Sequence, residues 1–229
     1  MPGEETPKKT IAVIGGTGKE GSGLALRWAH AGYQVVIGSR SAEKAEQAAA
    51  EMNAALGMQT VRGADNAAAA RQAGLVVVSV PYAAHKDTLL AIKDELSGKV
   101  VIDVTVPIQP PNILAITLPA GRTAAEEARA LLGETVRLVS AFQNVSTTHL
   151  KELDHPLNCD VLVTGDDAEA KQDVIALALA AGMRGIDAGP LSNAIVAESL
   201  TPLLMGINRR YKVKGAGIRI TNMDGEGNG

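Results

Sequence analysis

The stretch TIAVIGGTGKEG, residues 10–21, decides the fold of this chain. Residues 10–15 predict a buried β-strand, and residues 19–31 predict a helix that follows almost at once. The glycines at positions 16, 18 and 21 fit the pattern G-x-G-x-x-G. There the first glycine permits a tight turn, the second admits a pyrophosphate, and the third brings helix and strand together. The stretch therefore predicts a dinucleotide site at a helix start, the alternative being a glycine turn that only packs helix on sheet.

Short apolar runs alternate with alanine-rich helical stretches beyond this loop. Runs this apolar are typical of parallel strands covered on both faces by helices, so we expect a Rossmann-type doubly wound α/β sheet. The character changes after Phe142, which suggests a dinucleotide-binding domain over residues 1–142 and a smaller C-terminal α/β domain over residues 143–229. The Pro-rich segment 108–122 predicts an irregular surface loop. Strands are expected at 34–38, 59–62, 75–80, 100–104, 136–139, 160–165 and 183–187, and helices at 42–56, 65–72, 167–181 and 191–211.

Composition narrows the classes of partner. Aromatic residues make up only 2% of the chain and the net charge is -3, so little is offered to nucleic-acid bases or phosphates. No stretch approaches about 18 consecutive apolar residues, which argues against a membrane span. The single cysteine, Cys159, cannot form an intramolecular disulfide, and this favours the cytoplasm. The four histidines show no metal-ligand spacing as a set, so no metal site is predicted.

The end of the second predicted strand selects the cofactor. NAD sites usually place an acidic residue there to accept a hydrogen bond from the ribose 2′-hydroxyl. This chain has Ser39 and Arg40 instead, with Lys44 one helical turn further on. A guanidinium can grip a 2′-phosphate and a hydroxyl can donate to it, so the pattern favours NADP(H). The alternative is a solvated basic cluster at a helix start.

Two valines stand at the carboxyl ends of neighbouring strands, where ligands of open α/β sheets bind. Val80 precedes a proline after the fourth predicted strand, and Val106 precedes another after the fifth. Either the two valines wall a nicotinamide site, or the prolines simply punctuate the ends of strands.

With these residues in place, the chain resembles the F420-dependent NADP reductases, which exchange a hydride between NADPH and coenzyme F420, an 8-hydroxy-5-deazaflavin. The likeness runs over nearly the whole chain and in the same order. The third of its four segments is the most diagnostic, because a generic dinucleotide fingerprint does not predict it. The segments are IGGTGKEGSGLALRWA (14–29), VVIGSRSAEKAE (35–46), DAGPLSNAIVAESLTPLL (187–204) and GAGI (215–218).

The resemblance implies a role for individual residues. The segment from Gly16 to Glu20, with Thr17, Gly18 and Lys19 between them, would hold the pyrophosphate. Ser39, Arg40 and Lys44 would hold the 2′-phosphate, in agreement with the reading of the residues themselves. The C-terminal domain would cover a cleft in which the deazaflavin stacks on the nicotinamide, with Ala216 near its ring and Thr147 among the cofactor contacts. A homodimer is also implied.

One stretch departs from the family. Members typically have Ala-Leu-His-Thr-Ile-Pro-Ala beside the stacked rings, and here residues 141–147 read AFQNVST. Gln143 replaces the histidine, and it can donate and accept hydrogen bonds but does not titrate near neutral pH. Hydride transfer needs orientation more than an acid or base, so no catalytic residue is assigned. Gln143, Asn144 and Val145 are the candidates for positioning the rings.

Three functions stay open at this point. The first is an NADPH:F420 oxidoreductase, and the second is an NADP-dependent reductase of a small carbonyl, imine or other acceptor. The third is a non-catalytic NADP(H)-binding sensor.

The cofactor preference is testable at Arg40. We expect Arg40→Asp to weaken NADPH binding by about tenfold or more, because the change replaces a charge-assisted hydrogen bond with repulsion. NADH lacks the 2′-phosphate, so its binding should change far less. Titration of both cofactors by intrinsic fluorescence or calorimetry measures the two affinities, and equal losses for both would contradict the assignment.

Overall fold

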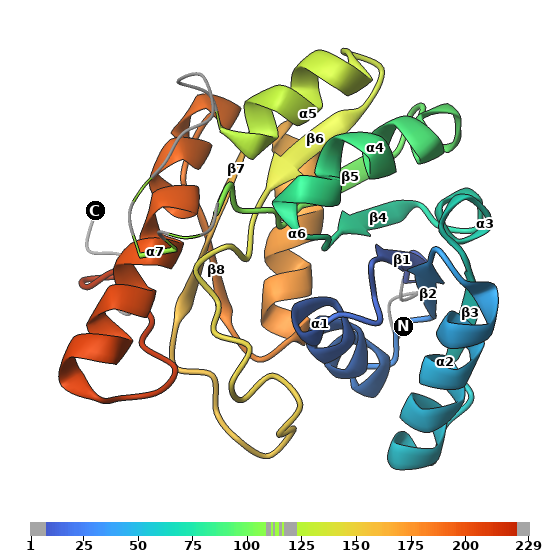
Figure 1. Ribbon diagram of the computed structural model, residues 1–229, viewed down its shortest axis with the longest axis horizontal. Coiled ribbons are helices and arrows are strands. Elements are labelled where there is room, and N and C mark those ends of the chain that lie inside the picture. Colours follow the sequence, from blue (N-terminus) through green and yellow to red (C-terminus); the bar gives the residue numbers. More distant parts are fainter. Residues whose placement is uncertain (1–7, 109–110, 112, 115, 117–122, 224–229) are drawn as a thin grey trace, which may run out of the picture.

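The computed structural model describes residues 8–108, 111, 113–114, 116 and 123–223, and most of the predicted loop at 108–122 lies outside them. Its centre is an eight-stranded sheet in the order β3-β2-β1-β4-β5-β6-β7-β8, which confirms the predicted Rossmann-type fold (Figure 1). The strands are β1 (Ile11–Ile14), β2 (Val35–Ser39), β3 (Val61–Asp65), β4 (Leu75–Val78), β5 (Val100–Asp103), β6 (Arg137–Ser140), β7 (Asp160–Gly165) and β8 (Arg184–Asp187).

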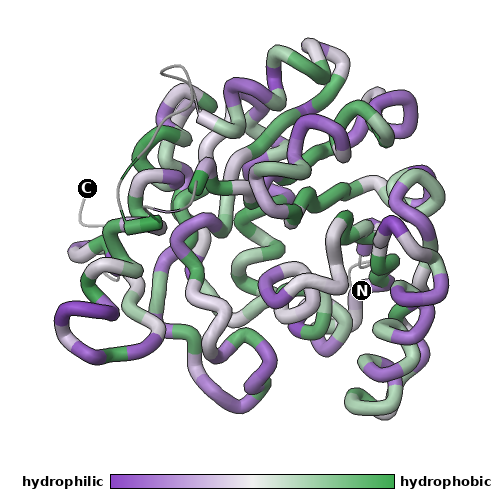
Figure 2. The backbone as a smooth tube through the Cα atoms, viewed as in Figure 1, coloured by the Kyte–Doolittle hydropathy of each residue, from purple (hydrophilic) through white to green (hydrophobic). Residues whose placement is uncertain are grey.

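Helices cover both faces of this sheet. Alternate strand residues such as Val13 and Val77 pack with α1, α2 and α6, whereas Ile14 and Val78 pack with α3, α4 and α5. Figure 2 shows the hydrophobic strands at the centre and hydrophilic residues along the outer helices. The helices are α1 (Lys19–His30), α2 (Ala42–Leu56), α3 (Asn66–Arg71), α4 (Tyr82–Ile92), α5 (Ala124–Leu132), α6 (Ala168–Ala180) and α7 (Ala194–Tyr211), with short 3₁₀ helices η1 (Lys93–Glu95) and η3 (Leu191–Asn193).

The sheet is parallel except between β6 and β7. The chain passes from β6 to β7 through turns and no crossover helix, so β7 returns antiparallel to its neighbour. Only Thr164 and Gly165 of β7 pair with β6, opposite Ser140 and Val139. The remaining residues of β7 extend beyond the carboxyl end of β6, where β8 pairs with them. These two strands therefore form a wall above the edge at which the parallel strands end.

Two helices in the structure are not predicted by the sequence patterns. In α4 the buried positions are His85, Leu89 and Ile92, so a titratable residue interrupts the apolar face on which a helix prediction depends. In α5 the signal is a capping box, in which Thr123 and Glu126 bind each other's backbone N–H groups. This helix follows the Pro-rich segment, which favours a loop and so obscures the capping signal. Within the described residues, no helix is long and apolar enough to cross a membrane.

Candidate functional site

The turn between β1 and α1 is built on glycine. Gly15 has φ +77°, a conformation that residues with a side chain rarely adopt. The N–H groups of Gly15 and Gly16 donate to the carbonyl oxygen of Gly38 at 3.0 and 3.1 Å, which ties the loop to β2. A Cβ at Gly21 would lie 3.0 Å from the carbonyl oxygen of Gly15. The structure thus has the tight turn at Gly15, one residue before the first glycine of the predicted pattern, and a close approach of α1 to this turn at Gly21.

Helix α1 begins without a side-chain cap. Its N-cap residue is Gly18, which has no side chain to accept hydrogen bonds from the first turn. The N–H groups of a helix's first turn have no partner within the helix, and the helix dipole favours an anion there. The exposed residues Thr17, Gly18 and Lys19 are therefore placed to receive one. Four other helices carry caps at the same position, from Ser41, Asp65, Thr123 and Asp167.

The basic residues after β2 lie on the surface close to this loop. The Ser39 hydroxyl accepts from the Ser41 N–H at 3.3 Å, and Ser41 in turn caps α2 by accepting from the Lys44 N–H at 3.3 Å. The side chains of Arg40 and Lys44 are exposed. Neither these residues nor Ser39, Gly16 or Thr17 line the cleft described in the next paragraph, which is called the main cleft from here on. A 2′-phosphate bound here would lie outside that cleft, as the far end of a long cofactor.

A cleft of about 570 Å³ runs from the start of α1, across the carboxyl ends of β4 and β5, to α7. It brings together most of the residues that the sequence predicts for the glycine loop and for the binding of the nicotinamide and deazaflavin rings. Residues from both sides of position 143 line it, so its walls come from both parts of the chain. The predicted residues in its lining are Gly18, Lys19, Glu20, Val80, Val106, Gln143, Asn144, Val145, Thr147 and Ala216.

Gln143 connects three elements at the floor of this cleft. Its side-chain Nε2 donates to the Asp103 carbonyl at the end of β5 and to the Ser140 hydroxyl at the end of β6, both at 2.8 Å. Its own carbonyl accepts from the Thr201 hydroxyl of α7 at 2.6 Å. Phe142 precedes it with φ 74° and packs edge-on against Trp28 of α1 at 5.7 Å. The position is therefore held from the sheet and from two helices.

Two amide oxygens in the lining have no partner among the described residues. They are Gln143 Oε1 and Asn144 Oδ1, both buried. A carbonyl can only accept, so the amide nitrogens must face the Asp103 carbonyl and, at 2.7 Å, the Asp160 carbonyl of β7. The free atoms are then the oxygens. A buried acceptor without a donor costs about 1–3 kcal/mol, so these two oxygens are unsatisfied polar atoms on residues that line the cleft.

The chain matches a known family. Residues 10–107 fit the family model described as NADP oxidoreductase, coenzyme F420-dependent. An F420-dependent NADP reductase of Methanocaldococcus jannaschii is 42% identical over 225 residues, which cover 93% of this chain and 99% of the relative. This chain belongs to the F420-dependent NADP reductase family. A second member, from Methanothermobacter thermautotrophicus, is 44% identical over 220 residues, covering 93% and 95% of the two chains.

A solved structure shares the fold. The protein, from Arthrobacter sp. FB24, is described as a candidate F420-dependent NADP-reductase, and it aligns with a TM-score of 0.78 at 24% identity. The alignment covers 93% of this chain and 99% of the other. The likeness is therefore one of fold over nearly the whole chain, and it is not confined to residues 1–142.

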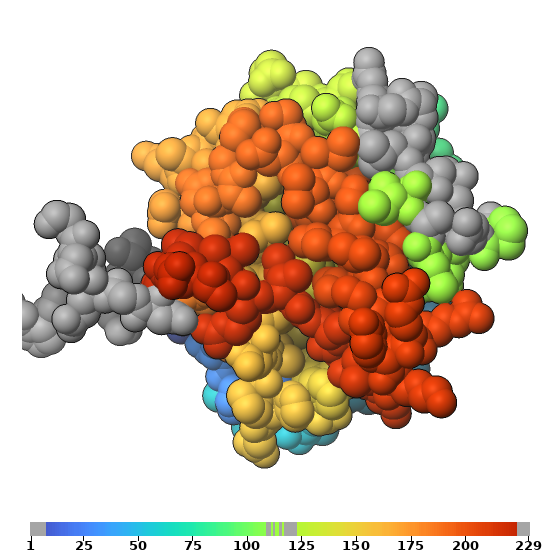
Figure 3. All heavy atoms as spheres, turned by 90° about the vertical axis from the view of Figure 1, so that its left-hand side faces the viewer, coloured from blue at the N-terminus to red at the C-terminus, as the bar shows by residue number. Residues whose placement is uncertain are grey.

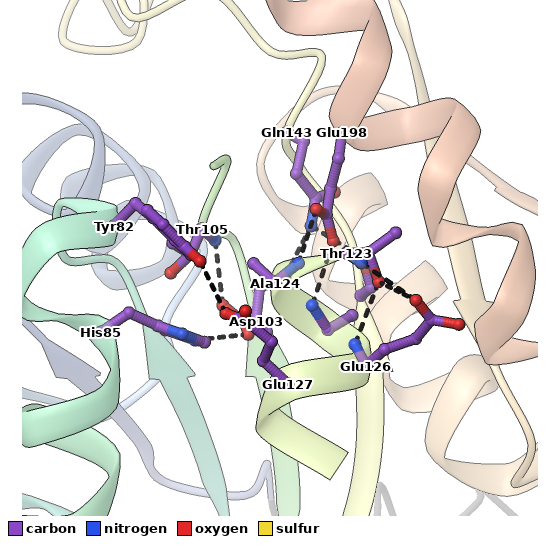
Figure 4. Close-up of polar contacts among 12 residues, drawn as sticks. Tyr82, His85, Asp103, Thr105, Thr123, Ala124, Glu126, Glu127, Gln143 and Glu198 are labelled. Atoms are coloured by element: carbon purple, nitrogen blue, oxygen red, sulfur yellow. Dashed lines mark hydrogen bonds and ion pairs between the residues drawn. The ribbon is translucent and has the colours of Figure 1, made fainter. Parts of the chain in front are cut away.

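Beneath the cleft, this family member carries a buried polar network (Figure 4). His85 Nε2 lies 2.7 Å from a carboxylate oxygen of Asp103, and both side chains are 1% exposed. Burial lowers the pKa of His85, but the adjacent Asp103 carboxylate outweighs it and holds the pKa above its ordinary value. Asp103 also accepts from the Thr105 N–H at 3.0 Å. The network thus fixes the end of β5 whose carbonyl binds Gln143.

A second pair of the network joins α4 to α5. The Tyr82 hydroxyl donates to Glu127 at 2.8 Å. Burial, followed by this hydrogen bond, raises the pKa of Tyr82 to about 12, so the phenol keeps its proton near neutral pH. Tyr82 lines the cleft directly after Pro81, at the start of α4.

Glu198 of α7 caps the N-terminus of α5, although the two are far apart in the sequence. Its two carboxylate oxygens accept from the N–H groups of Ala124 and Ala125 at 2.8 and 3.1 Å. Desolvation raises its pKa to about 8, with the charge of Asp103 adding to the effect and the two backbone hydrogen bonds opposing it. Glu198 therefore holds α7, one wall of the cleft, against the start of α5.

Several lining residues lie outside the sequence prediction. Tyr82, Thr105, Thr201 and Asn208 line the cleft, and His85, Asp103 and Glu198 support it. One signal was available, since Asp103 ends an otherwise apolar strand at the edge where ligands bind. The residues of α7 offered no such signal. Which face of a helix with mixed polar and apolar residues lines a cleft is known only when its packing partner is known.

The raised pKa of Glu198 makes a prediction about stability. A carboxyl whose pKa rises from 4.5 to about 8 on folding stabilises the protein fully below pH 4.5. That contribution is lost as the pH rises towards 8, by at most about 1.4 kcal/mol per pH unit. We expect Glu198→Gln, which cannot titrate, to flatten the fall in unfolding free energy between pH 5 and 8, measured by urea denaturation.

The matched control is Glu134→Gln, at a side chain that is 90% exposed. It should keep the slope of the unmodified protein. Equal slopes for the Glu198 variant and the unmodified protein would show that Glu198 is already charged in the fold.

Proposed function

We propose that this protein transfers a hydride between NADP(H) and coenzyme F420. One observation carries the proposal for this family member: a single cleft is lined at one end by the uncapped start of α1 and at the other by Gln143 and Asn144, whose amide oxygens have no partner among the described residues. The first end suits a pyrophosphate and the second suits flat rings with N–H donors. The cleft thus has one place that suits the pyrophosphate of NADP(H) and another that suits its nicotinamide ring with a second ring system.

At the phosphate end, we assign the pyrophosphate to the segment from Gly16 to Glu20 and the 2′-phosphate to Ser39, Arg40 and Lys44. Burial of the Glu20 carboxyl raises its pKa to about 8, although part of the residue stays in contact with solvent. A protonated Glu20 does not repel a phosphate. This agrees with an anion bound next to it.

At the ring end, Val80, Val106 and Val145 supply apolar walls that exclude water, and Thr147 and Ala216 complete the lining. When bound, the two cofactors supply the hydride-donating and hydride-accepting carbons. The protein holds the rings in register, and we assign this to the oxygens of Gln143 and Asn144 as acceptors for N–H groups. Gln143 also keeps its amide nitrogen on the sheet, so its free oxygen has one orientation.

The decisive experiment follows the deazaflavin absorbance with NADPH and oxidised F420, and then with NADP and reduced F420. Turnover in either direction is expected, and no turnover in both would overturn the proposal. Reduction of a carbonyl or imine from an acceptor panel would then favour the second function. Tight NADPH binding without any turnover would favour a sensor.

A variant at Ala216 separates the two ends of the cleft. Ala216 is anchored by its N–H, which donates to Asn208 Oδ1 of α7 at 3.0 Å. We expect Ala216→Leu to raise the KM for F420 by about tenfold or more, because the added carbons fill the ring end. The affinity for NADPH should hold in the same variant. Lys214→Ala, at an exposed residue outside the main cleft, is the control and should leave both unchanged.

We further propose that residues 143–229 act as the cover of the cleft, and that two copies associate through α7. The outer face of this helix carries large apolar side chains that are about half exposed: Ile195 at 41%, Val196 at 56% and Leu203 at 51%. Such a face is costly in water and suits a symmetric partner.

We place the protein in the cytoplasm, because its one cysteine is free.

The mass in solution tests the dimer. We expect twice the chain mass by light scattering, and we expect Val196→Glu to shift it to the monomer by burying a charge in the interface. Leu179→Glu, on α6 at a residue that is 73% exposed, is the control and should leave the dimer intact. A monomer before any substitution would rule out the association.

A further inference from the structure

Three side chains that can bind metal ions lie shortly after the cleft-lining residues 143–147 in the chain, at His149, Glu152 and His155. The Glu152 N–H donates to the His149 carbonyl at 3.1 Å, and the His155 N–H donates to the Glu152 carbonyl at 2.9 Å. Two successive turns of this kind place residues three apart on the same side. His149, Glu152 and His155 consequently form one column, although nothing in their sequence spacing indicates a set of ligands.

Their ligand atoms lie close together. Glu152 Oε2 is 3.0 Å from His149 Nδ1 and 3.8 Å from His155 Nδ1, and one ligand atom of each residue lies within 4.8 Å of the others. The two imidazole rings are stacked, with centroids 3.9 Å apart. The ligands of a tetrahedral zinc ion lie about 3.3 Å apart, because Zn–N and Zn–O bonds are about 2.0–2.1 Å long. To bind one ion, the stacked imidazoles must also turn about their side-chain bonds, because a metal lies in the plane of each imidazole that binds it.

The backbone beneath the column is held by a buried arginine. Arg27 of α1 is 6% exposed, and its Nη2 lies 3.1, 2.8 and 3.2 Å from the carbonyl oxygens of His149, Glu152 and His155. Because Nη2 carries two hydrogens, two of these carbonyls share one N–H. All three carbonyls therefore point inwards to one guanidinium, and the three side chains leave the loop outwards. A backbone fixed in this way loses little entropy when its side chains bind a ligand.

Two of the three residues border a hollow. A cavity of about 310 Å³ is lined by His149 and His155 together with the glycine segment 215–217. In Figure 3 the loop, in gold, lies on the surface next to the red C-terminal segment. Water or a small anion has room there to complete a coordination sphere.

We propose that His149, Glu152 and His155 bind a divalent transition-metal ion, with Zn²⁺ as the representative case. Two neutral imidazoles and one carboxylate are a ligand set that zinc accepts, and water fills the fourth position. None of the three side chains lines the main cleft, although the hollow beside the histidines shares Val145, Ser146 and Ala216 with it. The proposal does not depend on the proposed reaction.

Calorimetric titration of the tag-free protein with Zn²⁺ alone tests the site. We expect one equivalent to bind, and we expect His149→Ala and His155→Ala each to weaken binding by about tenfold or more. His30→Ala, at an exposed histidine elsewhere, is the matched control and should bind as the unmodified protein does. Zn²⁺ should also raise the melting temperature of the unmodified protein and of the control, and of neither site variant.

The three side chains are partly exposed, at 30%, 58% and 44%, so their removal leaves the core intact, and circular dichroism checks this. Cys159 also lines the cavity. Binding that is lost in Cys159→Ser and kept in His149→Ala would overturn the assignment. So would the absence of one-equivalent binding, or an equal loss in His30→Ala.

Discussion

The guanidinium of Arg27 is the interaction on which the arrangement of this molecule depends. A buried charge is stable only when it is well hydrogen-bonded, and here five carbonyls accept from the guanidinium, three of them from Nη2. Four belong to the loop at 149–155 and the fifth is that of Ala181, at the end of α6. Because Arg27 lies on α1, the helix whose first turn lines one end of the cleft also positions the C-terminal part of the chain.

Gln143 plays the corresponding part on the other side of the cleft. It replaces the histidine that the family resemblance implies, and it is neither exposed nor free to rotate, since the sheet takes both protons of its amide. The substitution exchanges a titratable group for a fixed acceptor. A hydride transfer that needs orientation rather than proton transfer tolerates such an exchange, provided that the network of His85 and Asp103 keeps β5 in place.

Local patterns predicted most of the sheet because they depend on neighbours in the chain. β7 was expected at 160–165 and is found there, and the helix after it begins one residue from its expected start. The local patterns do not predict α4 or α5, and for α4 the reason lies in its packing. A buried histidine is stable on the inner face of α4 only because Asp103 lies opposite, and that partner belongs to a different strand. The antiparallel direction of β7 goes with the connection that precedes it, which contains no crossover helix.

By itself the sequence determined the glycine turn, the strand–helix alternation and the basic end of β2 that favours NADP(H), since each rests on residues a few positions apart. Only the tertiary structure decided which side chains meet. The tertiary structure places the Glu198 carboxylate at the start of α5, 74 residues away in the chain. It also places the His149 carbonyl against the Arg27 guanidinium, across 122 residues. Contacts over such distances depend on how whole elements pack, and no local pattern of residues carries that information.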